Sequence, residues 1–100
     1  MAGSNTSRLV GDIGGTHCRL ALADAQGALS HIQTLIAADY PGVEEAISAY
    51  LETVGVRPQS ACLAVAGPTR RDSMLMTNLN WRCTDKTLNA RFGFSQAAFI

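Results

Sequence analysis

The sequence predicts an α/β domain with a three-stranded antiparallel meander first and parallel strands joined by crossover helices after it. Three observations predict this fold class. Three short apolar runs precede residue 37, the second of them alternating with a period of two, and only brief turn segments separate them. One stretch then carries apolar residues at the three-to-four spacing of a helix. Further short apolar runs follow this stretch, as expected for parallel strands that a helix connects.

The first three predicted strands follow a tail, residues 1–7, that we expect to be disordered. The first strand begins at Arg8 and runs into a glycine-rich segment, and the second covers residues 18–23. In the second strand Cys18, Leu20 and Leu22 share one face. The third strand covers residues 29–36. Short turns between them predict antiparallel neighbours.

The helical stripe consists of residues spaced by three and four: Val43, Ala46, Ile47, Tyr50, Leu51 and Val54. Residues 61–66 follow and are apolar on both faces, as in a buried central strand. Residues 73–77 predict a short strand. Thr84 is a good N-cap for a helix that Gly93 ends, and residues 97–100 open another strand. This order of elements is typical of the ribonuclease H-like arrangement, with a generic α/β sandwich as the alternative.

Composition excludes several classes of protein. Of the 100 residues, 47% are hydrophobic and 16% are charged, and the formal net charge is zero. Disorder needs low hydrophobicity and high charge, so the chain is expected to fold. Neutrality argues against a nucleic-acid partner, and no apolar run approaches the ~20 residues of a membrane span. So few charged residues predict that a partner, or more of the same chain, covers part of the surface.

The three cysteines are Cys18, Cys62 and Cys83. Their number is odd and their spacing matches no metal-binding pattern, which favours reduced and mostly buried thiols. Reduced thiols suit the cytoplasm. The N-terminus lacks the apolar segment of a signal peptide. We therefore expect a cytoplasmic protein.

The segment that carries chemistry is Gly11-Asp12-Ile13-Gly14-Gly15-Thr16, between the first two predicted strands. It is not a Walker A loop, because it has no lysine and no following helix, and its glycine spacing is not that of a dinucleotide fingerprint. Adjacent glycines permit positive φ and let a phosphate approach backbone amides, to which the Thr16 hydroxyl adds a donor. Asp12 would attract Mg²⁺, directly or through water. The segment predicts a hairpin for the phosphates of Mg–ATP; a purely structural turn is the alternative.

The run Leu9–Thr16, followed by Arg19-Leu20-Ala21-Leu22, closely resembles the opening of bacterial glucokinases, which belong to the actin-like ATPase superfamily. The resemblance extends from residue 9 to residue 100. It includes these further segments: Asp39-Tyr40-Pro41, Ala64-Val65-Ala66-Gly67-Pro68, Met76-Thr77-Asn78 with Trp81, and Phe92-Gly93-Phe94-Ser95.

The resemblance implies an ATP-dependent kinase that phosphorylates glucose at its 6-hydroxyl, the first step of glycolysis. It implies ATP, Mg²⁺ and glucose as partners, a possible homodimer, and residues 8–100 as an incomplete N-terminal part of the small lobe. It also places Gly67, Pro68, Thr77 and Asn78 near the substrate. The family's catalytic base, an aspartate, is expected just after Ile100, so this segment would be inactive alone.

One departure from the family concerns His17 and Cys18, which stand where the family usually has Asn-Ala. We assign His17 no role beyond that of a replacement polar residue, and we expect Trp81 to pack rather than to stack on a sugar. Two other functions remain open. One is a different sugar kinase or a sugar-binding regulator of the same superfamily. The other is a ribonuclease H-like nuclease with Asp12 as a metal ligand, which the neutral charge and the lack of further acidic strand ends disfavour.

Overall fold

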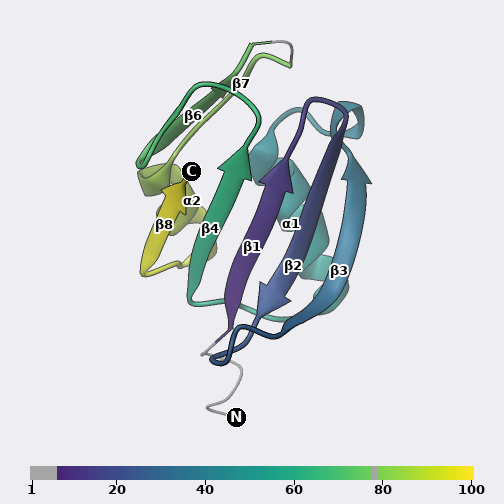
Figure 1. Ribbon diagram of the computed structural model, residues 1–100, viewed down its shortest axis with the longest axis vertical. Coiled ribbons are helices and arrows are strands. Elements are labelled where there is room, and N and C mark those ends of the chain that lie inside the picture. The colour runs from purple at the N-terminus through teal and green to yellow at the C-terminus, as the bar shows by residue number, and fades with distance from the viewer. Residues whose placement is uncertain (1–6, 78) are drawn as a thin grey trace.

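The computed structural model describes residues 7–77 and 79–100, and in them two sheets and two α-helices enclose one core (Figure 1). Strands β1 (Arg8–Ile13), β2 (His17–Ala23), β3 (Leu29–Ile36), β4 (Ser60–Val65) and β8 (Gln96–Phe99) form the larger sheet. Their order is β3-β2-β1-β4-β8. The molecule therefore has the mixed α/β sheet that the sequence predicts.

The larger sheet combines two kinds of pairing. Strands β1 and β2 pair antiparallel, as do β2 and β3, whereas β4 lies parallel to both β1 and β8. The pairing of β2 with β3 shifts between Leu20 and Leu22, close to His31, whose φ of 54° is left-handed. The Tyr50 hydroxyl donates a hydrogen bond of 2.7 Å to the His31 carbonyl and so ties this irregular strand to the helix behind it.

Helix α1 (Val43–Val54) connects β3 to β4, after a short 3₁₀ turn at Ala37–Asp39. Its buried residues are those of the predicted stripe, with Leu51 and Val54 half-buried against the core. Gly55 ends the helix at a left-handed φ of 68°, and its N–H donates to the Leu51 carbonyl. This is the usual way in which a glycine terminates a helix.

The second sheet contains β5 (Thr69–Arg70), β6 (Ser73–Met76) and β7 (Trp81–Thr84), paired antiparallel in that order. Only a strand at residues 73–77 was expected here, so the prediction missed two of the three strands. Helix α2 (Asp85–Phe92) follows β7 directly. As predicted, Thr84 is its N-cap and Gly93 its C-cap, with a φ of 72°.

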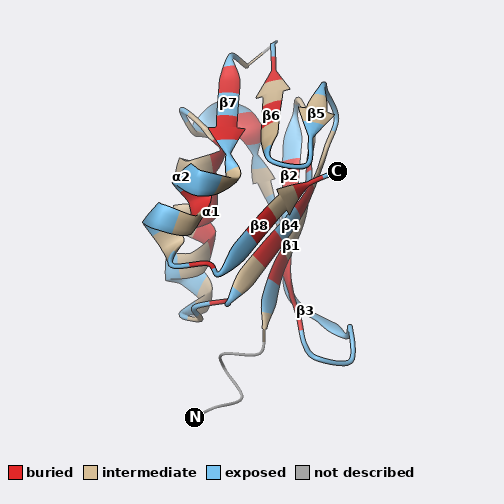
Figure 2. Ribbon diagram, turned by 90° about the vertical axis from the view of Figure 1, so that its left-hand side faces the viewer, coloured by how far each residue is buried: buried red, intermediate tan, exposed pale blue. Residues whose placement is uncertain are grey.

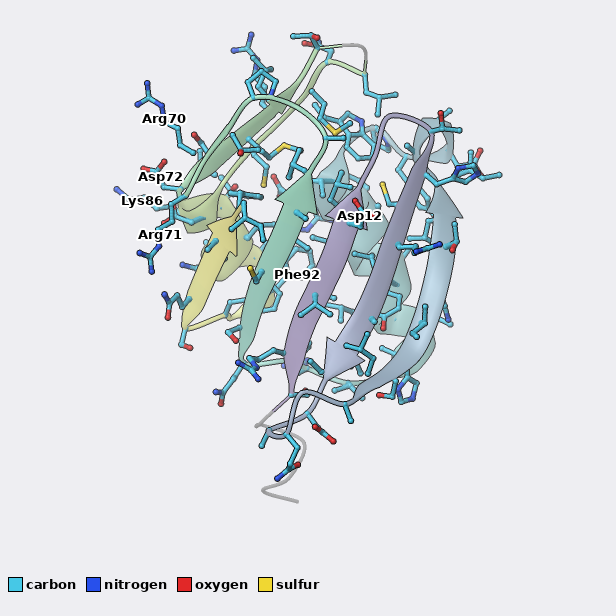
Figure 3. All side chains as sticks on the ribbon, in the orientation of Figure 1. Asp12, Arg70, Arg71, Asp72, Lys86 and Phe92 are labelled. Carbon is cyan, nitrogen blue, oxygen red and sulfur yellow. The ribbon has the colours of Figure 1, made fainter. Side chains whose placement is uncertain are left out.

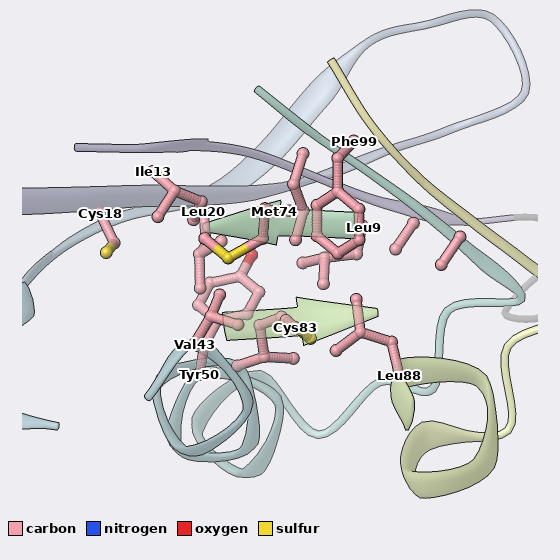
Figure 4. Close-up of a cluster of buried hydrophobic side chains, with 14 of the residues drawn as sticks. Leu9, Ile13, Cys18, Leu20, Val43, Tyr50, Met74, Cys83, Leu88 and Phe99 are labelled. Atoms are coloured by element: carbon pink, nitrogen blue, oxygen red, sulfur yellow. The ribbon is translucent and has the colours of Figure 1, made fainter. Parts of the chain in front are cut away.

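The core lies between the larger sheet and the two helices, and Figure 2 shows both helices on one side of that sheet. Residues of the second sheet complete it: Met74, Met76, Trp81 and Cys83 are at most 5% exposed (Figure 4). Trp81 is thus a packing residue, as expected. Strand β4 differs from the prediction, because Cys62 on its other face is exposed.

Of the predicted tail, residues 1–6 lie outside the described residues. The Ser7 carbonyl accepts a hydrogen bond of 3.0 Å from the Gln59 N–H. Within residues 7–77 and 79–100, neither helix is long and apolar enough to cross a membrane.

Candidate functional site

The candidate site lies where the parallel strands of the larger sheet end together. The Ala66 N–H, just after β4, donates a 2.9 Å hydrogen bond to the Ile13 carbonyl at the end of β1. The Val65 N–H donates to the Ile100 carbonyl at 3.0 Å, just after β8. These bonds hold the ends of three neighbouring strands in register. Ligands of α/β sheets bind at such carboxyl ends, so this edge is the natural place for a site.

The predicted phosphate hairpin joins β1 to β2 at this edge. Its turn is closed by a 2.9 Å hydrogen bond from the Gly14 N–H to the His17 carbonyl. The expectation of positive φ at the paired glycines is wrong: left-handed glycines in the described residues are Gly27, Gly55 and Gly93. Space favours a glycine at position 14 instead. A Cβ there would lie 3.0 Å from the His17 carbonyl oxygen.

Gly11 and Ile13 belong to strand β1 rather than to the turn. A Cβ on Gly11 would come within 2.7 Å of Leu20 Cδ2 and 2.9 Å of Leu63 Cδ2, so the missing side chain makes room for neighbouring strands. Ile13 is fully buried in the core. Both residues therefore contribute to the packing of strand β1, which carries the hairpin. Of the six predicted residues, Asp12 and Thr16 are the exposed ones.

Asp12 is on β1, with Arg19 of β2 on one side and Ala64 of β4 on the other. Figure 3 shows Asp12 on the face of the sheet away from the helices, which we call the outward face. Residues paired across strands point to the same face, so the Arg19 guanidinium shares it. Both are exposed, and both line a shallow hollow on that face. The alternation along β2 in the sequence indicates this orientation, because Arg19 falls out of phase with Cys18 and Leu20.

The hairpin fits an anionic ligand. In the described residues, neither the Gly15 nor the Thr16 N–H donates to a backbone or side-chain acceptor, so both remain available to phosphate oxygens. No cluster of three or more metal-ligating side chains occurs among the described residues. A single exposed carboxylate suits Mg²⁺, which keeps several waters and takes phosphate oxygens as further ligands. The residues present thus fit Mg–ATP, with Asp12 as the group that would hold the ion.

Gly67 and Pro68 lie in the connection that leaves β4 toward β5, next to the hairpin because Ala66 is bonded to Ile13. A Cβ on Gly67 would be 2.8 Å from the Leu75 carbonyl oxygen. The Pro68 carbonyl accepts a hydrogen bond of 3.1 Å from the Leu75 N–H. The second sheet therefore packs closely on this connection and fixes its path.

Thr77 is exposed in the connection between β6 and β7, and its carbonyl accepts a 3.2 Å hydrogen bond from the Asn80 N–H. Asn80 has a left-handed φ of 54°. Asn78, the fourth residue expected near the substrate, lies outside the described residues. Figure 1 shows this connection at the same end of the molecule as the hairpin.

The two residues that depart from the family are in β2. His17 is exposed, and Cys18 is fully buried beneath the hairpin. Burial raises the pKa of the Cys18 thiol above its ordinary value of 9.0; the nearby Asp12 carboxylate also raises it, against a backbone hydrogen bond to Gly14. The thiol therefore stays protonated at neutral pH and packs as a small apolar group.

Comparison with solved structures defines the class of protein first. A crystal structure of glucokinase from an Antarctic psychrotroph superimposes with a TM-score of 0.85 at 36% identity, covering 95% of this chain and 32% of that one. A glucokinase from Balamuthia mandrillaris, solved in complex with glucose, gives a TM-score of 0.67 at 26% identity, covering 95% of this chain and 29% of the other. The fold is thus that of sugar kinases.

Sequence comparison then identifies the family. A family model described as glucokinase matches residues 9–100, and the chain belongs to the glucokinase family. The glucokinase of Tolumonas auensis is 41% identical over 93 residues, which cover 92% of this chain and 29% of that protein. The chain therefore spans less than a third of the length of such relatives.

Proposed function

We propose that this chain is the N-terminal part of an ATP-dependent glucokinase, and that residues 11–16 hold the phosphates of ATP. The observation that carries the proposal is the hairpin. Its free Gly15 and Thr16 amides lie at the carboxyl edge of three strands, beside one exposed carboxylate, in a chain of the glucokinase family. Residues 8–100 would be the first part of the small lobe, built on the ribonuclease H-like arrangement of the actin-like ATPases.

The chemistry is the transfer of the γ-phosphoryl group of ATP to the 6-hydroxyl of glucose. Mg²⁺ would neutralise charge on the phosphate oxygens. Phosphoryl transfer depends mainly on positioning and charge stabilisation, which the residues of this chain supply in part. The Gly15 and Thr16 amides and the Thr16 hydroxyl would hold the phosphates, and Asp12 would hold the ion. The group that removes the proton from the sugar hydroxyl lies outside residues 1–100.

The connection at Gly67 and Pro68 and the connection at Thr77 and Asn78 would border the sugar. The hydrogen bond between Ala66 and Ile13 supports this, since it ties the first connection to the hairpin. We propose glucose and ATP as the ligands, a cytoplasmic location and, as the resemblance implies, a homodimer. A sugar kinase of different specificity, or a regulator that binds a sugar without phosphorylating it, is the second candidate because the sugar-selecting residues lie elsewhere.

A coupled assay of ADP release tests the proposed function. The continuous kinase polypeptide that contains residues 1–100 would be measured with ATP and Mg²⁺ and, in turn, glucose, mannose, fructose and N-acetylglucosamine. We expect the highest kcat/KM with glucose. ADP release that prefers another sugar would assign a different kinase, and sugar binding without ADP release would assign a regulator.

A further inference from the structure

The charges of this neutral chain are unevenly distributed. Residues 69–86 contain the second sheet and the start of α2, and they carry four of the chain's eight arginine and lysine residues but two of its eight acidic residues. The other residues therefore carry four basic and six acidic side chains. The second sheet and its surroundings are thus the positive part of a molecule whose formal net charge is zero. Such an asymmetry creates an electric field even where the summed charge vanishes.

Two of these four cations share the outer side of the second sheet. Arg70 on β5 pairs with Ser73 on β6, and Arg82 on β7 pairs with Leu75, two residues farther along β6. Both arginines therefore point away from the core, opposite to the buried Met74. Both are exposed, and strands β5, β6 and β7 contain no acidic residue. This side of the second sheet is positively charged.

The other two cations, Arg71 and Lys86, lie beside the edge of the larger sheet. The Arg71 carbonyl accepts a hydrogen bond of 2.9 Å from the Phe99 N–H on β8. The Asp72 carbonyl accepts one of 2.9 Å from the Asp85 N–H at the start of α2. These bonds fix the turn between β5 and β6 against both elements. Figure 3 shows the Arg71 and Lys86 side chains at this corner, with their charged ends directed away from the body of the molecule.

No close carboxylate neutralises these cations within residues 7–77 and 79–100. The ion pairs of the described residues are those of Arg91 with Glu44 and Glu45. Asp85, which precedes Lys86 in the sequence, accepts a hydrogen bond of 2.7 Å from the Lys86 backbone N–H through its carboxylate. The four positive charges are therefore available to a ligand that approaches from solvent.

The positive region lies beside the candidate site. Strand β8 is two strands away from β1, and Arg71 is hydrogen-bonded to the far side of β8. At the usual spacing between strands, Arg71 is about 15 Å from the strand that carries the hairpin. Figure 1 shows the second sheet at the same end of the molecule as the hairpin. This distance is too long for a hydrogen bond, but the field of a surface charge extends about 10–30 Å between 0.1 and 0.01 M salt.

We propose that the cations of residues 69–86 steer the anionic nucleotide Mg–ATP to the hairpin. This inference rests on the proposed function, because it concerns the ligand of that hairpin. Mg–ATP remains an anion, since one metal ion neutralises only part of the triphosphate charge. Positive charge near a site raises the rate at which anions reach it and requires no contact with them. The sugar is uncharged, so the effect is specific to the nucleotide.

Charge reversal tests the proposal through the rate of nucleotide association. An Arg70→Glu/Arg71→Glu variant of the continuous kinase polypeptide replaces two exposed cations by anions. The control is Arg8→Glu/Arg57→Glu, which changes the net charge equally at the opposite end of the larger sheet, where β1 and β4 begin. Stopped-flow fluorescence with Mg²⁺ and an ATP analogue that carries a fluorophore on its ribose measures the association and dissociation rate constants.

We expect the association rate constant of Arg70→Glu/Arg71→Glu to fall about threefold at an ionic strength of about 50 mM, from the Coulomb interaction at about 15 Å. At about 0.5 M it should equal the wild-type value, because salt screens the field. The control should change it by less than about twofold, and the dissociation rate constants should stay within about twofold. An Arg70→Lys/Arg71→Lys variant, which keeps both charges, should associate at the wild-type rate.

Three results would overturn the proposal: equal slowing by the two charge reversals, slowing that persists at 0.5 M, and equal slowing by the lysine variant. The first would assign the effect to net charge, and the other two to direct contact. The association rate is independent of phosphoryl transfer. Steering in a protein that phosphorylates no sugar would refute the proposed function alone. An active glucokinase in which both charge reversals bind the nucleotide equally fast would refute this inference alone.

Discussion

Position 67 needs a glycine because of the space around it, not because of its backbone angles. A Cβ there would lie 2.8 Å from a backbone atom, the Leu75 carbonyl oxygen, which cannot rotate away as the end of a side chain can. The second sheet would have to shift relative to β4.

Gly67→Ala should therefore lower the free energy of unfolding by about 1–3 kcal/mol, the usual cost of overpacking. Gly42→Ala is the matched control, because the atom its Cβ would meet is Glu45 Oε1, at the end of a flexible side chain. The urea midpoint measures both. A Gly67→Ala variant that is no less stable than Gly42→Ala would contradict the close packing of this connection.

Burial of Tyr50 makes the stability of the protein depend on pH. Burial raises the pKa of its phenol above the ordinary value of 10.0, and burial likewise raises the pKa of the Cys83 thiol above 9.0. The folded protein thus holds these protons more tightly than the unfolded chain does. Their contribution to stability is complete below the unfolded values and is lost as the pH rises through the folded ones.

Stability should accordingly be level near neutrality and decline above about pH 9. Tyr50→Phe should make the decline shallower above about pH 10, and at pH 7 it should cost about 1 kcal/mol because the His31 carbonyl loses its hydrogen-bond donor. Urea titrations at several pH values measure both effects. An identical alkaline decline in the variant would show that Tyr50 does not titrate as argued.

Among the elements, helix α2 depends most on its cap. It has eight residues, and of these only Leu88 is buried. Thr84 accepts a hydrogen bond from the Thr87 N–H, and the Thr87 hydroxyl accepts one in return from the Thr84 N–H. This reciprocal pair satisfies two N–H groups at the start of a short helix that buries little apolar surface.

Thr84→Ala should lower the free energy of unfolding by about 1 kcal/mol. Thr53→Ala on α1 is the control, since its hydroxyl bonds only to the Ala49 carbonyl of its own helix and is exposed. The two urea midpoints should differ clearly. Equal midpoints would mean that the cap adds nothing that solvent does not supply.

Prediction from sequence succeeded where one local pattern decides an element. The stripe on α1 and the caps of α2 depend on residues near one another, and the structure confirms them. The second sheet was missed because β5 has two residues and β7 has four, too few for a period to be read. Their pairing depends on a turn at Arg71 and Asp72 and on the burial of Trp81, both of which are set by the tertiary structure.

The prediction of the candidate site was likewise right where a local pattern decided it and incomplete where distant residues did. The motif predicted a hairpin between two strands, and the structure has Asp12 on β1 and Thr16 in the turn, both exposed. The positive φ that the paired glycines permit is not adopted there. The tight space around Gly14 comes from the neighbouring His17 carbonyl and cannot be predicted from the glycine alone. The hydrogen bond from Ala66 to Ile13, which brings the second connection to the hairpin, joins residues 53 positions apart and leaves no local signal.

At the scale of the whole molecule, the low content of charged residues goes together with a face of the larger sheet that no described helix covers. The buried core lies on one side of the larger sheet, and the other side carries an apolar row with polar rims. The candidate site lies at the strand ends, with Asp12 on the outward face.

The central claim is that Asp12 and the hairpin act on the phosphates of ATP and not on the sugar. Its most direct test is steady-state kinetics of Asp12→Ala in the continuous kinase polypeptide, with Glu52→Ala as a surface control. We expect kcat to fall roughly 10²–10³-fold, as when a group that stabilises developing charge is removed, while the dissociation constant for glucose stays within about twofold. A wild-type kcat, or a loss confined to glucose binding, would contradict the account.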